Sequence, residues 1–563
     1  MRKKRKGIES MAAMTDLINE HLGYKIKEAM IYRNYLVLVF LLLNGISFGQ
    51  ELETETVEVV KNFEARLADA NKIRLEPAPE VKEVTDKRFD YLIEEKSLQV
   101  DYLAPSIKAL GVSTEKIDPG YRGFVKAGFG YPLSPYLDAG YLFGEEGNSN
   151  LLARLSHHSA NDKNIENQRF SDNDLLLKGT LLTDKGFSLD GFGTVSLDNH
   201  YFYGYNQEDT TFEADDVRNK LNLYELGLKI YNSAETDTKL NYWAAFKGYR
   251  FGNNFATRET GLNIDLGLTK WFGDNPLSIA LGTDLTRLKD TAIQKLNTFY
   301  INPSFSFGTS SLRFKIGAEL ASADEEYFIF PDAELLLNVA GSGMSIFVGT
   351  DGGLRKNNFR ILSDYNPFLV PQVSSIKNSS FYDFYAGVKG LAAGIEYSAQ
   401  AGYKPTNDLA LFEVNQEKEW TRFDVLYDTA NIIYLQASVK GQLFQNLDLS
   451  GSIVQNFYDL NNEDKAWYLP NLQANIGLSY LTLDQQLRLK AEVYVNDAVA
   501  YQELGLPNEP NLLFDVSLGA DYFLTPNFGL FLHLNNLSTN KYRRWYGYPG
   551  FGLNVLGGLT ARF

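Results

Sequence analysis

Apolar and polar residues alternate with a period of two over most of the chain after Gly120. Residues 487–495 alternate leucine, alanine and valine with arginine, lysine, glutamate and tyrosine, and segments 472–480, 262–269 and 175–182 show a similar alternation. Successive side chains of a strand point to opposite faces of a sheet. Each segment therefore predicts a β-strand with one apolar face, and in many of them the other face is rich in charged or long polar side chains.

A water-soluble β-sandwich would also alternate in this way, but three features favour a transmembrane β-barrel. Aromatic residues gather near predicted strand ends, the chain ends in an apolar strand, and short and long connections alternate. The predicted short connections include 144–149, 183–186, 273–276, 308–310, 341–343, 444–446, 481–484 and 525–527. The predicted long connections include 159–171, 206–217, 356–380, 405–428, 460–466, 497–511 and 537–549. The fold class predicted is all-β, an antiparallel barrel over residues 120–563.

The strand number follows from the parity of these connections. If both ends of the barrel lie in the periplasm, the number of strands is even and every second connection is short. With 405–428 taken as one extracellular hairpin, the pattern predicts about 22 strands. Dividing that hairpin into two membrane strands would put the short turn at 444–446 on the wrong side.

The amino-terminal residues predict export. Residues 30–49 read as a signal peptide, with Arg33 before an apolar run over 35–43 and small residues before Gln50. A transmembrane helix is the alternative, but nine apolar residues are too few to cross about 30 Å of hydrocarbon. Residues 1–29 look like an over-extended start, and residues 50–119 predict a short, mostly extended periplasmic segment.

Composition excludes several other classes of protein. Aromatic residues make up 13% of the chain, which argues against disorder, and the absence of cysteine excludes disulfides and cysteine-ligated metals. The net charge of -16 makes a nucleic-acid partner improbable. With the signal peptide, the expected location is the cell outer membrane, where lipid is the first partner.

The residues that could carry chemistry are few and scattered. His157 and His158 are adjacent, so on a strand they face opposite sides, and His200 could approach one of them only if neighbouring strands align. No G-x-S-x-G or phosphate-cradling loop occurs. We therefore expect no enzyme activity, no catalytic residues, no metal site and no cofactor.

The carboxy terminus resembles that of TonB-dependent receptors. Residues 535–542 read NNLSTNKY, Tyr-Pro-Gly follows at 548–550, and the last strand ends in Phe563. The resemblance implies a 22-stranded barrel. Leu559, Ala561 and Phe563 share one apolar face, the form of the signal by which outer-membrane barrels are recognised for insertion, so the barrel-assembly machinery is an expected partner.

Near the mature start, a short segment resembles the TonB box, the extended segment that pairs with TonB. It comprises Glu55, Thr56, Val57, Glu58 and Val59. The family also carries a folded plug between box and barrel, whereas only about 70 residues lie between Gln50 and Gly120 here. We expect these residues to form an extended tether, not a plug. That segment with long loops such as 356–380, or another protein, would then fill the lumen, unless the barrel leaks.

Two functions follow as hypotheses. The resemblance implies an importer that moves a substrate across the outer membrane with energy from TonB. The alternative is a barrel without transport activity, acting as a scaffold or partner in an outer-membrane assembly, secretion or envelope complex. A passive porin is disfavoured, because an unfilled barrel of 22 strands would breach the permeability barrier.

Overall fold

The structure is a computed structural model, and it describes residues 121–563 apart from short gaps. The gaps are 145–148, 184, 235, 340, 342, 416, 418–419 and 498–511. The predicted signal peptide, the TonB-box-like segment and the 50–119 tether lie outside the described residues.

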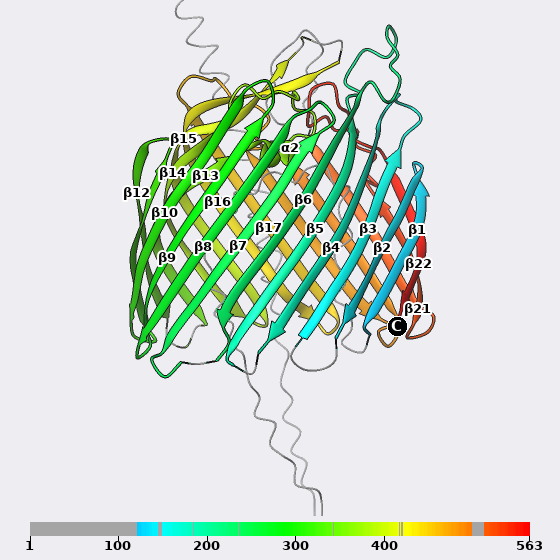
Figure 1. Cartoon of the computed structure of the whole chain (residues 1–563). Helices are drawn as coiled ribbons and strands as arrows, with labels where there is room; N and C mark the ends of the chain where they lie inside the picture. The colour runs from blue at the N-terminus through cyan, green and yellow to red at the C-terminus, as the bar shows by residue number, and fades with distance from the viewer. Residues whose placement is uncertain are drawn as a thin grey trace, which may run out of the picture. The chain divides into compact units, whose positions relative to one another are not determined.

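The described residues form a closed antiparallel barrel (Figure 1). Each strand pairs with the next, and β1 pairs with β22, so no edge is left open. The strands are β1 (Gly123–Tyr131), β2 (Ser134–Phe143), β3 (Ser149–Asn161), β4 (Arg169–Leu182), β5 (Phe187–Tyr201), β6 (Arg218–Asn232), β7 (Leu240–Asn253), β8 (Arg258–Phe272), β9 (Asn275–Lys289), β10 (Ile293–Gly308), β11 (Leu312–Ala323), β12 (Glu326–Val339), β13 (Met344–Asn357), β14 (Lys377–Ala392), β15 (Ile395–Asn415), β16 (Arg422–Phe444), β17 (Leu447–Leu460), β18 (Leu472–Thr482), β19 (Leu487–Asn496), β20 (Leu513–Phe523), β21 (Phe528–Asn535) and β22 (Asn554–Arg562). Helix α2 (Phe359–Tyr365) lies between β13 and β14. The prediction of an all-β barrel with about 22 strands is confirmed.

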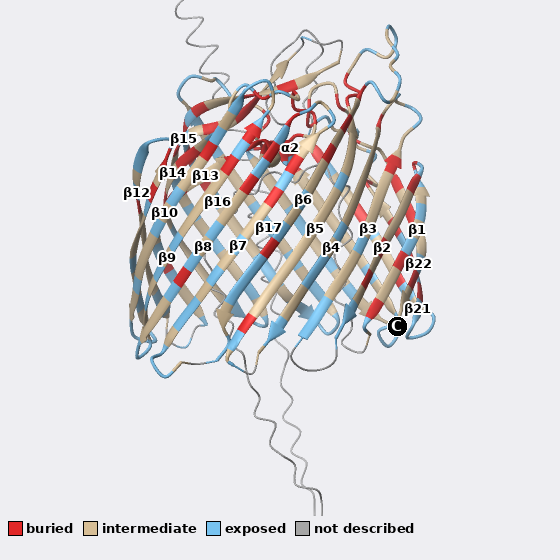
Figure 2. Cartoon of the chain, viewed as in Figure 1, coloured by how far each residue is buried: buried red, intermediate tan, exposed pale blue. Residues whose placement is uncertain are grey.

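The outer face of the barrel is apolar, as the alternation predicts. Leu489, Ile476 and Leu266 are large apolar residues, yet their exposed fractions are 41%, 53% and 45%. Figure 2 shows exposed residues along the outside of the strands. A lipid bilayer is the environment in which such a face is stable, and a closed barrel satisfies the backbone hydrogen bonds there. In the described part of the chain, no helix has the length and apolar character needed to span a bilayer.

The two ends of the barrel differ in their connections. Turns such as 445–446 and 524–527 join strands at the end where the carboxy terminus lies, and the long loops lie at the opposite end (Figure 1). Strands β15 and β16 have 21 and 23 residues and pair up to Asn415 and Arg422, with one register shift between Thr406 and Leu409. The 405–428 segment is therefore one hairpin that extends past its neighbours, as predicted.

The last residues close the barrel. The backbone nitrogen of Phe563 donates to the carbonyl of Gly123 on β1 at 3.0 Å, and its ring stacks on Tyr141 at 6.0 Å between centroids. Leu559 and Phe563 are 63% and 57% exposed on the outer face. Phe563, Ala561 and Leu559 thus lie on the face that meets lipid at the closing seam. Their role in insertion stays a prediction.

The NNLSTNKY segment forms a turn that is fixed by one asparagine. Asn536 has a φ of 52° and is buried, and its side chain donates to the carbonyls of Asn540 and Phe551 at 2.9 Å each. Its side-chain oxygen also accepts from the backbone nitrogen of Asn540 at 3.1 Å. Asparagine tolerates a positive φ better than most residues. The motif thus holds the loop after β21 in position above the lumen.

Candidate functional site: a lid and the lumen around it

Residues 358–376, which we call the lid, fold inward at the end of the barrel that carries the long loops. Helix α2 begins the lid, and Asn358 caps it by accepting from the backbone nitrogen of Ile361 at 3.1 Å. The lid packs against inward-facing apolar residues at the upper ends of the strands. These wall residues include Leu221, Tyr249, Phe251, Leu288 and Leu296.

A buried carboxylate fixes the start of the lid. Glu259 on β8 is fully buried and accepts from the backbone nitrogen of Phe359 at 2.7 Å and from Asn358 Nδ2 at 2.8 Å. Tyr249 OH donates to the same carboxylate at 2.8 Å. Buried polar groups are stable only when they are hydrogen-bonded. This network therefore ties helix α2 to the barrel wall.

Further hydrogen bonds fix the rest of the lid. Asn219 Nδ2 on β6 donates to the carbonyl of Pro367 at 2.9 Å. Gln294 on β10 donates to the carbonyl of Val373 at 3.1 Å and accepts from the backbone nitrogen of Ile376 at 3.0 Å. On the far side, the lid pairs with Phe423 of β16. The backbone nitrogen of Val370 donates to the carbonyl of Phe423 at 2.8 Å, and the backbone nitrogen of Phe423 donates to the carbonyl of Phe368 at 3.1 Å, which forms a parallel bridge opposite Leu369. The lid thus spans the mouth from β6–β10 to β16.

Aromatic side chains from other loops complete the closure. Tyr548 stacks on Phe368 of the lid with ring centroids 3.6 Å apart, and Tyr203 OH donates to the carbonyl of Pro549 at 2.9 Å. Trp545 is only 1% exposed, and its ring packs edge-on against that of Tyr365 with centroids 5.8 Å apart. Burial raises the pKa of Tyr203 and of Tyr548 above its ordinary value, so both hydroxyls stay neutral.

We call the whole cluster the mouth core. It comprises Phe202, Tyr203, Val217, Leu221, Tyr249, Phe251, Leu288, Leu296, Phe359, Leu362, Tyr365, Phe368, Leu369, Val373, Ile376, Phe412, Phe423, Val425, Tyr468, Trp545 and Tyr548. Its members come from the lid, from the inner wall and from at least three other loops, so the long loops close the mouth jointly. The sequence-based expectation that loop 356–380 helps to fill the lumen agrees with this packing.

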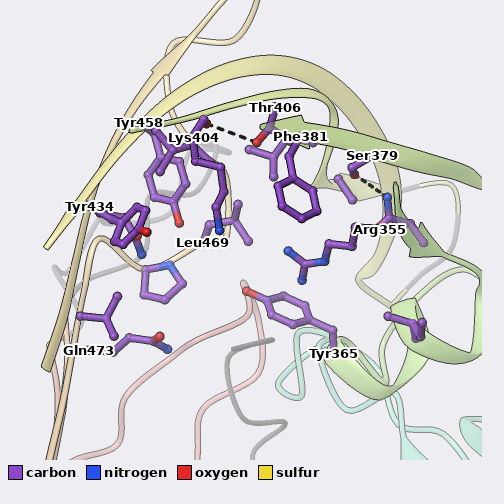
Figure 3. Close-up of a pocket in the computed structure, with 18 of the residues that line it drawn as sticks. Arg355, Tyr365, Ser379, Phe381, Lys404, Thr406, Tyr434, Tyr458, Leu469 and Gln473 are labelled. Atoms are coloured by element: carbon purple, nitrogen blue, oxygen red, sulfur yellow. Dashed lines mark hydrogen bonds between the residues drawn. The ribbon is translucent and has the colours of Figure 1, made fainter. Parts of the chain in front are cut away.

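A cavity of about 330 Å³, the lid cavity, lies between the lid and the inner wall of β13–β18. Arg355 and Lys404 extend from different strands toward the same space, and Tyr365 of helix α2 points its hydroxyl into it (Figure 3). The cavity is lined by Arg355, Asn357, Ile361, Leu362, Tyr365, Ser379, Phe381, Gln400, Lys404, Thr406, Leu409, Ala410, Phe412, Ile432, Tyr434, Gln436, Val454, Asn456, Tyr458, Leu469, Pro470 and Gln473. Among these described residues there is no aspartate or glutamate.

A polar network on the wall positions Lys404. Its ammonium group lies 3.3 Å from Asp383 Oδ2, and Tyr434 OH donates to both oxygens of that carboxylate at 3.0 and 3.1 Å. Gln400 Nε2 donates to Tyr434 OH at 2.6 Å. Since Lys404 and Asp383 are both largely buried, their pairing offsets part of the cost of removing two charges from water.

Two other cavities in the lumen carry charges of both signs. A central cavity of about 1220 Å³ is lined by Lys389, Glu396, Lys440, Glu492, Asp515 and Arg544 among others. A third, of about 510 Å³, is lined by Asp172, Asp174, Asp198, Lys247, Lys356 and Arg360 among others. The lid cavity differs from both because its charged lining residues are all positive.

The histidines do not come together. His157 Nδ1 lies 2.7 Å from Asn173 Oδ1, whereas His158 lies near Ser134, which is consistent with opposite faces of β3. His200 approaches Asp172 at 3.9 Å on the inner wall. No group of three or more potential metal-binding side chains occurs in the described part of the chain.

Sequence reasoning missed Arg355, Lys404 and Glu259. Each lies at an inward-facing position of a strand, so the period-two pattern assigns the face. The pattern does not reveal that Arg355 and Lys404, 49 residues apart, line one cavity, or that Glu259 meets Asn358 of the lid, 99 residues away.

A scan against known protein families finds no match, and a search of the curated proteins finds none either. Solved structures do match. The chain resembles the ferric-catecholate import receptor Fiu from E. coli K12, with 10% identity, a TM-score of 0.60 and coverage of 79% of this chain and 82% of that chain. It also resembles the FrpB iron transporter of Neisseria meningitidis (F5-1 variant), with 10% identity, a TM-score of 0.62 and coverage of 79% of this chain and 83% of that chain. The copper transporter OprC matches with 14% identity, a TM-score of 0.59 and coverage of 79% of this chain and 83% of that chain.

These likenesses concern the fold. The barrel has the fold of these outer-membrane receptors and transporters, which agrees with the resemblance seen at the carboxy terminus. The matched proteins are transporters and receptors by their descriptions, and identities of 10–14% carry no information about a substrate for this chain.

Proposed function

We propose that this protein is an outer-membrane import receptor whose lid moves to admit a small solute. The lid cavity carries the proposal, because a concave space of this size with convergent polar groups and some apolar lining is typical of small-molecule sites. The receptor-type barrel supports it, since the matched structures with that fold include a ferric-catecholate import receptor, an iron transporter and a copper transporter.

Energy for lid movement would come from outside the barrel, since the outer membrane separates two aqueous compartments without a nucleotide supply. The TonB-box-like residues Glu55 to Val59 are the candidate contact with TonB. An extended segment that adds a strand to the sheet edge of a partner needs backbone N–H groups as hydrogen-bond donors. A Val57→Pro change removes one donor and should abolish uptake if these residues act as a box. A Val57→Ala variant is the matched control and should transport normally.

The test is to lock the lid. The chain has no cysteine, so a Leu369→Cys, Phe423→Cys pair would be its only thiols. The two residues form a backbone bridge, and paired strands bring Cα atoms within the range that a disulfide needs. If the protein is an importer, the oxidised pair should reproduce the growth defect of a deletion strain, and a reductant should reverse it. The two single-cysteine variants control for lost packing.

The scaffold hypothesis remains as the second candidate, and the dense mouth core favours it. A lid held by Glu259, Asn219 and Gln294, with more than a dozen buried apolar side chains, resembles a permanent wall. If the oxidised cysteine pair complements the deletion strain completely, lid movement is not needed and the importer is rejected in favour of the scaffold.

A further inference from the structure

We propose that the inner wall of β15–β18 binds a neutral, hydroxyl-rich solute, a short oligosaccharide, and leads it from the lid cavity into the central cavity. This inference rests on the proposed function, because it names the class of solute that the import receptor would take. Two buried amide groups where the cavities meet, and a strip of small side chains below them, carry the argument.

The two cavities follow one another along the same strands. On β16, Gln436 lines the lid cavity, and the next inward-facing residue, Ser438, lines the central cavity. The same step occurs on β15, β17 and β18, between these pairs of inward-facing residues: Gln400 and Ser398, Val454 and Ser452, and Gln473 and Asn475. A solute that leaves the lid cavity along this wall therefore enters the central cavity directly.

Two amide groups at this step have buried atoms without hydrogen-bond partners. Gln473 on β18 and Asn496 on β19 lie opposite each other in the sheet (Figure 3 shows Gln473). Both are at inward-facing positions, since Ile476 on β18 and Leu489 on β19 belong to the exposed outer face. Gln473 Nε2, a donor, and Asn496 Oδ1, an acceptor, have no partner in the described part of the chain, and Asn496 is only 3% exposed. A buried polar atom without a partner is costly, so both atoms favour a ligand that supplies the missing bonds.

The opposite character of these two atoms selects the chemistry of the ligand. A hydroxyl group both donates and accepts, so one hydroxyl, or two on neighbouring carbons, can bond to Asn496 Oδ1 and to Gln473 Nε2. An ionised carboxylate only accepts, and an ammonium group only donates. Either ion would leave one of the two atoms unsatisfied, whereas a saccharide satisfies both.

Below the amide pair, small side chains line the wall of the central cavity. They are Ser398, Ser438, Ser450, Ser452 and Gly477. Ser398 and Ser438 hydrogen-bond to each other at 2.7 Å, and each hydroxyl keeps a further site for an acceptor bond. A side chain at Gly477 would first meet Ser450 and Glu492, whereas the ring of Trp243 fills the space beside the inward-facing Gly267 on β8. The strip thus offers room and hydroxyl groups together.

The charges of the central cavity do not favour an ion of either sign. Its described lining holds three basic and three acidic residues: Lys389, Lys440, Arg544, Glu396, Glu492 and Asp515. An ion pays a large cost when it leaves water, and a neutral polyol pays much less if its hydroxyls are hydrogen-bonded. The balance of charge therefore agrees with a neutral solute.

The experiment is calorimetric titration of the full mature chain in detergent with three neutral trisaccharides: maltotriose, cellotriose and raffinose. A methyl-capped polyethylene glycol of similar mass is the comparison, because its ether oxygens accept hydrogen bonds but do not donate them. At least one trisaccharide should bind at least about tenfold more tightly than the glycol, because a site built for hydroxyl groups rejects an analogue without them.

Two variants test the amide pair. Asn496→Leu removes the acceptor and should weaken trisaccharide binding about tenfold while leaving the affinity for the glycol unchanged. Gln473→Leu removes the donor and should have a similar effect. Heat-modifiable migration in electrophoresis would verify that each variant is folded.

A bulky side chain tests the route. Ser450→Trp narrows the central cavity and should reduce uptake of the radiolabelled trisaccharide by cells at least severalfold. Ser278→Trp on β9 is the matched control and should transport normally. Ser278 also faces the lumen, because Leu277 and Ile279 are exposed on the outer face, but it lines neither cavity.

Four results would overturn the inference. The site is rejected if none of the trisaccharides binds better than the glycol, or if the folded Asn496→Leu and Gln473→Leu proteins bind them normally. It is also rejected if trialanine binds more tightly than all three, since the ligand is then a peptide. The route along β15–β18 is rejected if folded Ser450→Trp transports as well as Ser278→Trp.

The two proposals can fail separately. Trisaccharide binding to a protein whose locked lid causes no growth defect would keep the site and reject the importer. A growth defect of the locked lid without trisaccharide binding would keep the importer and reject this class of solute.

Discussion

The upper interior of the barrel and its middle differ although the same strands build both. On β7, the inward-facing Tyr249 and Phe251 are 7% exposed each and pack in the mouth core, whereas Lys247, two residues from Tyr249, contributes a charge to the mixed-charge cavity beside them. The inner face of β7 thus changes from apolar at the mouth to charged within a few residues. Among the described residues, the dense apolar packing is therefore at the mouth, and the wall of the lumen below it is lined with polar and charged side chains.

The largest expected effect is at the centre of the mouth core. Replacing Trp545 by alanine should lower the free energy of unfolding by about 3–5 kcal/mol, because a fully buried indole leaves a cavity. At the short-turn end of the barrel, Tyr397→Ala should cost much less, since Tyr397 is only half-buried beside the central cavity. Urea titration of both variants makes the comparison. Circular dichroism of the backbone is the signal, because it does not depend on the tryptophan that is removed. Equal losses would remove the distinction between the two regions.

The next effect contrasts the outer face with the inner face of one strand. Leu489→Arg on β19 should cost up to about 2–4 kcal/mol, because the charge would enter lipid. Tyr494→Arg on the lumen side of the same strand should cost far less. Folding into lipid vesicles, followed by electrophoretic mobility, measures both. A similar loss at the two positions would mean a sheet buried on both faces and would contradict a membrane barrel.

A smaller effect is expected at the lid anchor. Glu259→Gln keeps the shape of the side chain but weakens the hydrogen bond to Phe359, so the lid should lose about 1–2 kcal/mol. Limited proteolysis should then cut the 358–376 segment faster. The conservative change Glu396→Gln, at the start of β15 beside a short turn and away from the lid, is the control. Unchanged proteolysis in Glu259→Gln would mean that the apolar packing alone holds the lid.

The sequence predicts the barrel well because a lipid-facing strand needs an apolar residue at every second position. Leu489 and Ile476 carry that signal within a single strand, and the parity of the turns then gives the strand count. The candidate site, in contrast, depends on contacts between residues far apart in the sequence. Glu259 and Asn358 meet across 99 residues through the fold of an irregular loop. Arg355 and Lys404, 49 residues apart, reach one cavity through the register of β13, β14 and β15. Period and composition do not specify such contacts. Long loop 356–380 was recognisable, but its inward path was only one of several alternatives.

The carboxy-terminal motif lies between these extremes. NNLSTNKY could be recognised by resemblance, and the structure adds the reason: Asn536 holds the turn through its side chain at a positive φ. An Asn536→Ala change should therefore loosen the loop that carries Trp545 and Tyr548 into the mouth core.

Single-channel conductance tests the central claim, that the lid closes the mouth of the barrel. The full mature chain and a variant with residues 358–376 replaced by a short glycine-serine linker would be compared in planar bilayers under the same salt. We predict that the wild type shows little conductance and that the variant shows discrete openings at least several-fold larger, since a barrel of this strand number has a wide lumen. Equal conductance in the two proteins would contradict the lid as the element that closes the barrel.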